Sequence, residues 1–230
     1  MRFVALPVRS HWQDFTAPLL EHLRRHEQVD GIIVMDNGST DETPEQLNRL
    51  RRDPRFVVFD VPHDNLASMW NRAIRFAAAG RGDELVIANN DVTLAPGTIA
   101  ALCNALRDDP SLWAVSPNPE RRVAEGITEA GVREVGGSYR LGGLIGWCFA
   151  LAAEHWKGIV HPIPEDYEWW YGEDHLFADI THRGGRMARV LGVPCDHVGS
   201  GTATDGENDW TTAAIGRDEE RFRQRWPEHP

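Results

Sequence analysis

Two aspartates that follow short apolar runs are the residues best placed to bind a polar ligand. Asp36 ends a run that begins at Gly31, and Asp91 follows a second run at residues 84–88. An unbroken apolar run of this length predicts a strand buried on both faces, as in a parallel sheet. Open α/β sheets bind nucleotides and other polar ligands at the carboxyl ends of their strands. We therefore expect both carboxylates at one ligand-binding edge.

Both aspartates also have a purely structural interpretation. Aspartate is a frequent turn former, so Asp36 could serve only the tight turn that Asn37-Gly38 begins. Asp91 could likewise only cap the turn before Pro96. The residues after Gly38 offer N-cap oxygens to a following helix, which Pro44 can enter in its first turn.

The elements that must position these residues alternate regularly over the first half of the chain. Strands are predicted at residues 2–8, with a break at Pro7, and at 31–36, 56–61, 84–88 and 112–116. Helices are predicted at residues 15–26, 44–52, 66–79 and 96–107. This alternation predicts an α/β fold with a mostly parallel, doubly wound sheet.

The alternation ends near residue 116, and the second half is rich in loops. Strands are predicted at residues 147–152 and 186–191, and helices at 173–183 and 211–225. Because no linker divides the chain, we expect one domain over residues 1–230. Residues 1–92 would form a nucleotide-binding half, and residues 93–230 a half that builds the substrate cleft.

Composition excludes several classes of function. The 230 residues suffice for one α/β domain, and a net charge of −11 argues against general binding to DNA, RNA or anionic membranes. A phosphate ester bound here would need a cation, for which a metal ion is a natural candidate. Without a membrane-length apolar run or a secretory signal, we expect a cytoplasmic enzyme. Cys103, Cys148 and Cys195 are too far apart for a CxxC site and are expected to be free, mostly buried thiols.

Two motifs carry a resemblance to a known family. Asp36-Asn37-Gly38-Ser39-Thr40-Asp41 and Asn89-Asn90-Asp91 resemble motifs of the GT-A glycosyltransferases, specifically the inverting family 2 type and its rhamnosyltransferase-like branch. In that family the first motif holds the base or ribose of a nucleotide. The second binds a divalent metal.

Three further matches follow in the family's order, so that the resemblance covers residues 2–201. Asn65 and Asn71 resemble polar residues of a helix that starts beside the nucleotide. Glu173-Asp174 resembles an acceptor motif whose aspartate is the usual catalytic base. The segment His197-Val198-Gly199-Ser200-Gly201 resembles a late motif whose histidine can ligate the metal.

The resemblance implies transfer of a sugar from a UDP-, dTDP- or GDP-linked donor to an acceptor hydroxyl. Asp91 and His197 would bind Mn²⁺ or Mg²⁺, which stabilises the charge of the departing diphosphate. Asp174, with Glu173 beside it, would take the proton of the attacking hydroxyl, and one displacement inverts the anomeric centre. Asp196 is a rival metal ligand, and Glu173-Asp174 could instead be an acidic pair favoured at a helix N-terminus.

The implied binding residues fall into two sets. The donor-binding set is Pro7, Arg9, Asp36, Asn37, Ser39, Asn65, Asn71 and Asn90. The acceptor- or sugar-binding set is Gly146, Trp147, Trp170 and Tyr171. Aromatic rings pack against sugars, but tryptophan is also a common core residue, so we expect one or two of Trp147, Trp156, Trp169, Trp170 and Tyr171 to touch substrate. Arginines at 72, 75, 183 and 186 could contact phosphate, although a solvated surface position is favoured for each.

The acceptor is not specified by these motifs. A glycan, a protein, a small molecule or a modified DNA base would each fit, and the acidic charge disfavours the last. We expect no integral membrane segment. A second copy of the chain, in a homodimer, is a further candidate partner.

Two other enzyme classes fit less well. Sugar-nucleotide pyrophosphorylases need a glycine-rich loop after the first strand, and residues 7–12 contain no glycine. A dehydrogenase is disfavoured because no GxGxxG follows that strand. A non-catalytic nucleotide- or sugar-binding protein on the same fold stays open, although the acidic residues at the expected positions count against it.

Overall fold

The computed structural model describes residues 1–62, 64–137, 142–199 and 208–228. Nine strands in these parts form a single sheet in the order β3-β2-β1-β4-β8-β6-β9-β5, with β7 paired to β9. The strands are β1 (Arg2–Val8), β2 (Gly31–Asp36), β3 (Phe56–Asp60), β4 (Glu84–Ala88), β5 (Val92–Leu94), β6 (Leu112–Asn118), β7 (Val132–Val135), β8 (Cys148–Ala152) and β9 (Arg186–His197). The helices are α1 (Ala17–His26), α2 (Thr43–Leu50), α3 (Leu66–Phe76), α4 (Thr98–Asp108), α5 (Gly172–His182) and α6 (Asn208–Arg225).

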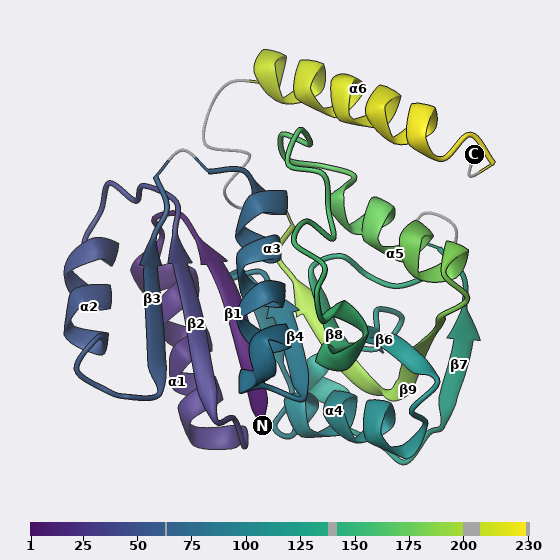
Figure 1. Cartoon of the computed structure of the whole chain (residues 1–230). Helices are drawn as coiled ribbons and strands as arrows, with labels where there is room; N and C mark the ends of the chain where they lie inside the picture. Colours follow the sequence, from purple (N-terminus) through teal and green to yellow (C-terminus); the bar gives the residue numbers. More distant parts are fainter. Residues whose placement is uncertain (63, 138–141, 200–207, 229–230) are drawn as a thin grey trace.

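The first four long strands form the parallel part that the sequence predicts. β1 pairs in parallel with β2 and β4, and β2 pairs in parallel with β3. In this register Val8 lies opposite Asp36, so β1 and β2 end at the same edge. Figure 1 shows the carboxyl ends of β1, β2 and β3 on the side of the molecule where α6 lies. This edge is where ligands bind in open α/β sheets.

The predicted break at Pro7 is wrong. β1 continues through Pro7, which lies opposite Met35 in the ladder with β2. Proline has no backbone N–H, but its fixed φ is compatible with extended backbone, and the ladder between β1 and β4 ends at Ala5, before Pro7. The strand accordingly continues to Val8.

The second half adds antiparallel strands that the alternating pattern does not predict. β8 lies antiparallel between β4 and β6, and the short strands β5 and β7 pair antiparallel with β9. The strand predicted at residues 186–191 extends to His197, past a register shift opposite Pro117 and Asn118. Three- and four-residue strands such as β5 and β7 are too short to show a period in the sequence.

Helix boundaries differ from the predictions by a few residues, for local reasons. Residues Trp12–Thr16 form a π-helical turn before α1, and Ala77–Arg81 forms another after α3. α4 starts at Thr98 rather than at Pro96, because Gly97 has a left-handed φ of 87°.

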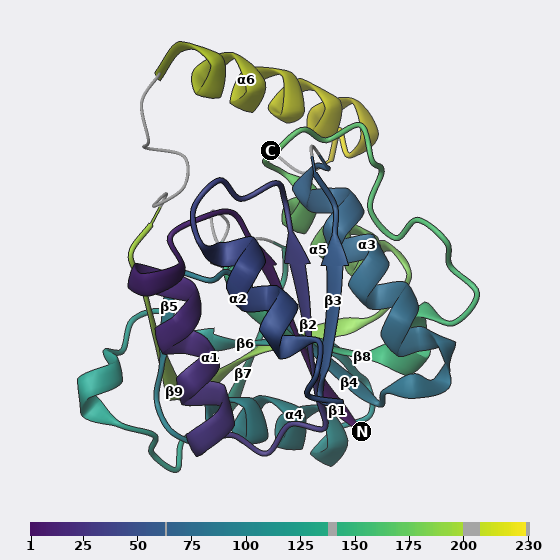
Figure 2. The same ribbon diagram turned by 90° about the vertical axis from the view of Figure 1, so that its left-hand side faces the viewer.

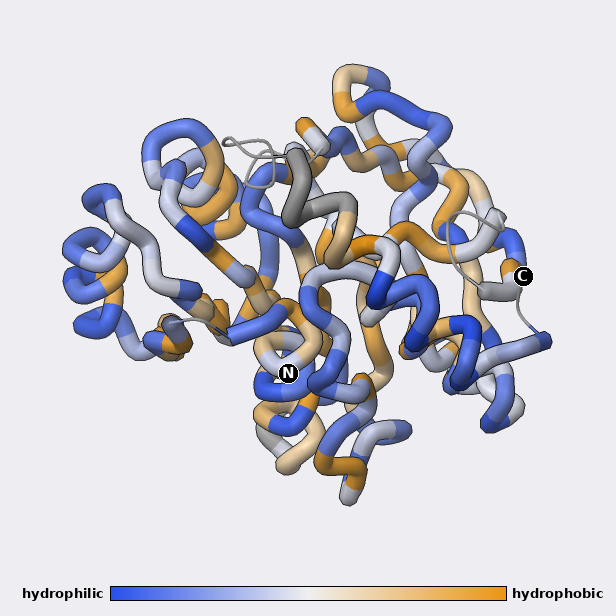
Figure 3. Tube along the Cα trace, turned by 90° about the horizontal axis from the view of Figure 1, so that it is seen from above, coloured by the Kyte–Doolittle hydropathy of each residue, from blue (hydrophilic) through white to orange (hydrophobic). Residues whose placement is uncertain are grey.

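Helices cover both faces of the sheet, and strand residues contribute alternately to two cores. Phe3 and Ala5 of β1 pack in a core that α3 and α5 cover, whereas Val4 and Leu6 pack in a core with α1 and α4. Figure 2 shows α1 and α3 on opposite sides of β2 and β3. Viewed from above, the helices carry hydrophilic residues on the outside of the molecule (Figure 3). The prediction of strands buried on both faces is therefore confirmed for β2 and β4, and β1 is buried in the same way from Phe3 to Val8.

Cys103, Cys148 and Cys195 are free and buried, as expected. None of the helices in the described ranges combines the length and apolar character needed to cross a lipid bilayer.

Candidate active site

A cavity of about 280 Å³ opens at the carboxyl edge of the parallel strands. It collects residues from the end of β1, the turn after β2, the start of α3, the β4–β5 turn, the segment before β8 and the end of β9. The predicted site residues in its wall are Pro7, Arg9, Asn37, Asn90, Asp91, Gly146, Trp147, Trp170, Glu173 and His197. Most of the residues that the resemblance implied therefore meet in one place, although they come from distant parts of the chain.

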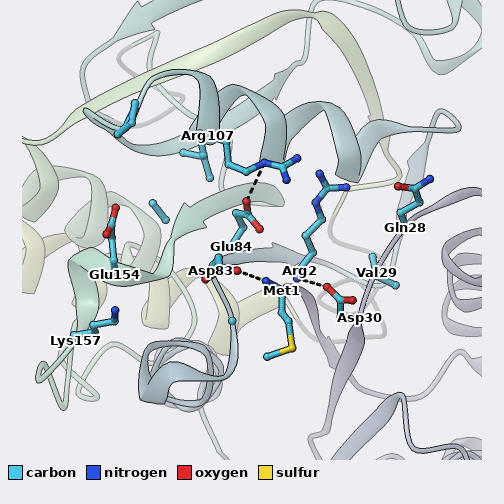
Figure 4. A pocket seen from close by; sticks show the side chains of 14 residues that line it. Met1, Arg2, Gln28, Val29, Asp30, Asp83, Glu84, Arg107, Glu154 and Lys157 are labelled. Carbon is cyan, nitrogen blue, oxygen red and sulfur yellow. Dashed lines mark hydrogen bonds and ion pairs between the residues drawn. The ribbon is translucent and has the colours of Figure 1, made fainter.

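A second, larger cavity of about 760 Å³ lies at the opposite edge, beside the start of β1 (Figure 4). Charged groups in its wall pair with one another: Glu84 with Arg107 at 3.3 Å, and the Met1 amino group with Asp83. Figure 4 also shows the Asp30 carboxylate accepting the backbone N–H of Arg2, at 2.8 Å. Its volume is greater, but its location at the amino ends of the strands and its mutually paired charges favour the smaller cavity as the active site.

The β5–β9 ladder brings the two predicted metal ligands together. Val92 lies opposite His197 in this ladder, and the Val198 N–H donates to the Asp91 carbonyl at 3.2 Å. As a result, the Asp91 Oδ1 and His197 Nε2 atoms lie 3.0 Å apart in the cavity wall. The imidazole is further held by the Trp147 ring, which stacks on it at 5.0 Å between centroids and 7° between planes.

These two groups fit a divalent cation. Although 3.0 Å from the carboxylate, the buried His197 Nε2 lacks the alignment of a hydrogen bond and has no such partner among the described residues. A carboxylate oxygen with an imidazole nitrogen suits Mn²⁺ or Mg²⁺, which takes its other ligands from phosphates and water. The described residues contain no cluster of three or more His, Cys, Asp or Glu. Among the described residues, Asp91 and His197 are therefore the two groups that would hold the cation.

The rival ligand Asp196 lies elsewhere. It neighbours His197 on β9, opposite Thr93, and successive side chains of a strand point to opposite faces. Its carboxylate lies 3.6 Å from the Arg122 guanidinium and accepts the Val123 N–H at 3.4 Å. Asp196 is therefore turned away from the cavity that His197 lines.

The turn after β2 uses Asp36 and Ser39 for its own structure. Asp36 is buried, and its Oδ1 accepts both the N–H of Ser39, at 3.0 Å, and the hydroxyl of Ser39, at 2.5 Å. The Ser39 hydroxyl oxygen accepts the Ser10 N–H at 2.7 Å. Neither residue contributes to the cavity wall. The turn-forming interpretation thus accounts for the Asp36 contacts, and its neighbour Asn37 lines the cavity.

Asn37 presents a polar atom without a partner. Its amide nitrogen donates to the Asp64 carbonyl at 2.9 Å, which fixes the side chain. The Asn37 Oδ1 atom is buried and has no hydrogen bond to any described residue. A buried acceptor left open in a cavity wall is costly unless a ligand donates to it.

The predicted donor ligands Asn65 and Asn71 lie outside the cavity wall. Asn65 caps α3 by accepting the Ser68 N–H at 2.8 Å, and it donates to the Glu165 carbonyl at 2.6 Å. The fully buried Asn71 donates to the Ile163 carbonyl at 2.6 Å and accepts the Ile163 N–H at 3.0 Å. Their amides fasten a distant segment to α3, which explains why the cavity does not include them.

The two acidic residues at the start of α5 lie in different places, one in the cavity wall and the other buried. Glu173 lines the cavity, whereas Asp174 is 8% exposed and does not contribute to the wall. Gly146 permits this placement, because a Cβ atom built there would lie 2.6 Å from Glu173 Cγ. Tyr171 is also absent from the wall, since its ring packs against Phe222 of α6 at 5.5 Å between centroids.

The wall contains residues that the motif comparison missed. Trp169 joins Trp147 and Trp170 in the wall, whereas Trp156 is a core residue that is 1% exposed. The apolar floor of the cavity consists of Leu66, Met69 and Trp70 of α3. Their i, i+3, i+4 spacing marks one helix face, but it does not distinguish a cavity floor from a core.

Positive charge in the wall is sparse. Arg9 lies 6.0 Å from the Trp169 ring centroid and is the one Lys or Arg among the described lining residues. The other candidate arginines have partners elsewhere, for example Arg75 with the Val160 carbonyl and Arg186 with Glu134. A diphosphate in this cavity would therefore depend on Arg9 and on a cation.

The motif residues Ser200 and Gly201 lie outside the described residues.

Solved glycosyltransferases share this fold. The mannosyltransferase PcManGT from Pyrobaculum calidifontis, solved with GDP-Man and Mn²⁺, has a TM-score of 0.69 and 19% identity over 100% of this chain and 64% of its own. Glucosyl-3-phosphoglycerate synthase from Mycobacterium tuberculosis, solved with Mn²⁺, UDP and glucosyl-3-phosphoglycerate, has a TM-score of 0.66 and 17% identity over 98% and 79%. GalNAc-T7, solved with UDP, GalNAc and Mn²⁺, has a TM-score of 0.65 and 14% identity over 86% and 43%.

These neighbours confirm the GT-A fold. The chain spans less than two thirds of the length of PcManGT and of GalNAc-T7. No curated protein sequence matches this chain. The family described as "Glycosyl transferase family 2" matches residues 4–131, a region that includes both strand-end motifs. Since this match extends over more than half of the sequence, the chain belongs to glycosyl transferase family 2.

Proposed function

We propose that this protein transfers a sugar from a nucleotide-diphosphate sugar to an acceptor hydroxyl, with inversion at the anomeric carbon. The observation that carries the proposal is the pair formed by Asp91 Oδ1 and His197 Nε2, 3.0 Å apart in the wall of the carboxyl-edge cavity. We assign the protein to the rhamnosyltransferase-like branch on its Asn89-Asn90-Asp91 motif. We further propose that residues 1–230 form one catalytic domain, which works in the cytoplasm.

Asp91 and His197 would hold Mn²⁺ or Mg²⁺. The cation supplies compensation for the negative charge that develops on the departing diphosphate. Asn90 supports the acidic turn by donating from its amide to the Thr16 hydroxyl at 3.0 Å. Arg9 is the lining residue that can add a second positive charge next to a phosphate.

The nucleoside would contact the turn after β2. The open Asn37 Oδ1 can accept a hydrogen bond from an N–H of a nucleobase, a donor that uracil, thymine and guanine each possess. This fits UDP, dTDP or GDP as the leaving group. The neighbouring structures contain UDP or GDP-Man together with Mn²⁺, which supports the same class of donor.

The base would be one of the two carboxylates at the start of α5. The resemblance implies Asp174, whereas Glu173 is the carboxylate in the cavity wall. A base must come within hydrogen-bond reach of the acceptor hydroxyl, although such contacts often tighten only when substrate binds. Asp174→Asn and Glu173→Gln separate the two: the base variant should lose transfer and keep donor binding, and the other should keep measurable transfer.

The acceptor would lie against the aromatic part of the wall. Trp147, Trp169 and Trp170 offer flat faces of the kind that pack against the C–H groups of sugars. This favours a glycan among the candidate acceptors, ahead of a protein, a small molecule or a modified DNA base. A homodimer is compatible with the proposal.

A panel of nucleotides tests the proposal. Binding is measured as thermal stabilisation of the protein by UDP, dTDP or GDP, each with and without Mn²⁺. Transfer is measured as release of the nucleotide from the corresponding nucleotide sugars. We expect one nucleotide to stabilise the protein only when Mn²⁺ is present. Stabilisation by none of them, with or without metal, would refute the proposal.

A further inference from the structure

The C-terminal helix α6 lies over the carboxyl edge of the sheet and contacts the segment of residues 166–171 that precedes α5 (Figures 1 and 2). Asp218 of α6 is fully buried. Its carboxylate accepts three consecutive backbone N–H groups, those of Glu168, Trp169 and Trp170, at 2.9 to 3.0 Å. Successive N–H groups directed at one point form an anion-binding concavity, which here a side chain of the same protein fills.

A group of ion pairs surrounds this contact. The Arg217 guanidinium donates to both carboxylate oxygens of Glu168, at 2.6 and 2.7 Å. Arg221 joins the two acidic residues, at 3.1 Å from Glu168 and 2.7 Å from Asp218. Hydrogen bonding from Arg217, followed by Arg221, lowers the pKa of Glu168 to about 2. These pairs are therefore charged at neutral pH.

The backbone that follows is strained and needs external support. Tyr171 has a φ of 62°, in the left-handed region that non-glycine residues rarely adopt. Such a conformation persists only where the surroundings over-determine it. Here α6 contacts the strained residue and the one before it: Asp218 holds the N–H of Trp170, and Phe222 packs against the Tyr171 ring.

The segment that α6 holds is part of the active-site wall. Trp169 and Trp170 line the cavity, and Glu173 follows in the first turn of α5. We propose that Asp218 is a positioning residue, which fixes the tryptophan pair of the sugar-binding wall through its three backbone hydrogen bonds and without touching substrate. The proposal rests on the proposed function, since substrate binding is one of its readouts.

The test compares Asp218→Ala and Asp218→Asn with Glu220→Ala. Glu220 is an exposed acidic residue of the same helix, and its carboxylate accepts a hydrogen bond from the side chain of Gln224 at 3.2 Å. Hydrogen exchange should become at least about tenfold faster at the amides of residues 168–170 in Asp218→Ala. It should be less affected in Asp218→Asn, which keeps one carbonyl oxygen as an acceptor, and unchanged in Glu220→Ala.

Kinetics separate positioning from a merely structural role. At a temperature well below melting, we expect Asp218→Ala to raise KM for the active nucleotide sugar or its acceptor by about tenfold, with a smaller change in kcat and partial rescue in Asp218→Asn. A purely structural role would lower thermal stability and leave KM unchanged. Unchanged exchange at residues 168–170, or faster exchange with unchanged KM, would overturn the proposal.

A second variant and a nucleotide-binding measurement complete the test. If Asp218→Ala does not fold, Arg217→Ala removes the ion pair with Glu168 while leaving Asp218 in place, and it should accelerate exchange at residue 168 more than at residue 170. An equal acceleration of exchange at residues 168 and 170 would contradict the contacts proposed between α6 and this segment. If wild-type protein binds neither UDP, dTDP nor GDP with Mn²⁺, the proposed function fails, whereas the variant-to-variant difference in exchange still decides whether Asp218 fixes the tryptophan segment.

Discussion

Asp91 and His197 show how single residues acquire a chemical role only through their neighbours. Each is ambiguous in the sequence, as a turn aspartate and a turn histidine. The β5–β9 ladder places their side-chain atoms 3.0 Å apart, and stacking on Trp147 fixes the imidazole. A carboxylate oxygen and an imidazole nitrogen side by side are donors that suit a divalent cation, whereas either group alone would not select a metal.

The metal assignment predicts the effect of Asp91→Ala. Removing this oxygen ligand should weaken binding of the stabilising nucleotide (UDP, dTDP or GDP) in the presence of Mn²⁺ by about tenfold or more, since even the outer partners of metal ligands are worth 10–100-fold. Isothermal titration with that nucleotide at fixed Mn²⁺ measures the change. Asp196→Ala is the matched control, because Asp196 neighbours His197 on β9 but faces Arg122. An unchanged response to Mn²⁺ in Asp91→Ala would remove this residue from the site.

Gly146 predicts a second effect on catalysis. In Gly146→Ala the new Cβ would lie 2.6 Å from Glu173 Cγ, so the glutamate must move out of its place in the wall. Because small misplacements of reacting groups are costly, we expect kcat to fall by about 10- to 100-fold. Gly136→Ala is the control, since a Cβ there meets no atom of the described residues within 4 Å. Equal rates for both variants would show that the position of Glu173 is unimportant for transfer.

At the scale of elements, α3 connects the cavity floor to a remote segment. Leu66, Met69 and Trp70 provide the floor, whereas Asn71 on the same helix pairs with both backbone groups of Ile163. α3 therefore lines the cavity and also holds, through Asn71, the segment at Ile163 that leads to Trp169 and Trp170. The same segment is held from its other side by α6.

This arrangement predicts that Asn71→Ala is a stability variant. The substitution leaves the buried N–H and C=O of Ile163 without partners, which costs about 1–3 kcal/mol of unfolding free energy. Urea unfolding followed by tryptophan fluorescence measures it. Asn48→Ala, at an exposed position of α2, should stay within about 0.5 kcal/mol of wild type. A loss no larger than that of the control would contradict the contact.

At the scale of the whole molecule, a buried histidine couples folding to pH. Burial, followed by the charge of Arg225, lowers the pKa of His175 from 6.5 to about 4. The His175 Nδ1 atom accepts the indole N–H of Trp226 at 2.9 Å, which requires this nitrogen to be unprotonated. In the unfolded chain the imidazole protonates below about pH 6.5. The contribution of His175 to stability is therefore present above pH 6.5 and lost as the pH falls towards 4.

This coupling predicts that the unfolding free energy of His175→Gln depends less on pH than that of the wild-type protein. Between pH 7 and pH 4 the group should account for a loss on the order of 3 kcal/mol of unfolding free energy, which His175→Gln should abolish. Denaturant titrations at half-unit pH steps measure the slope. His26→Gln, at the exposed end of α1, should retain the wild-type slope. Parallel slopes for wild type and His175→Gln would contradict the assignment.

Much of the fold could be predicted because its signals are local. The runs at residues 31–36 and 84–88 coincide with β2 and β4, since a buried parallel strand requires an unbroken apolar run. β5 and β7 could not be predicted, because they are three- and four-residue strands that exist only by pairing with β9. Pro7 was misjudged for a related reason: the pairing of β1 with β2 continues through Pro7 to Val8, and only the tertiary structure shows this pairing.

The sequence by itself determined the alternation of strands and helices, the strand-end motifs and thereby the family, because each depends on residues that are close together in the chain. Tertiary structure alone decided which motif residues reach the cavity. Asn37 lines it while Asp36 closes the turn, and Glu173 lines it while Asp174 is buried. It also decided that Asp218, with no motif of its own, holds two tryptophans of the wall. The physical reason is that hydrogen bonds between residues remote in sequence depend on how strands and helices pack, and no local pattern records that packing.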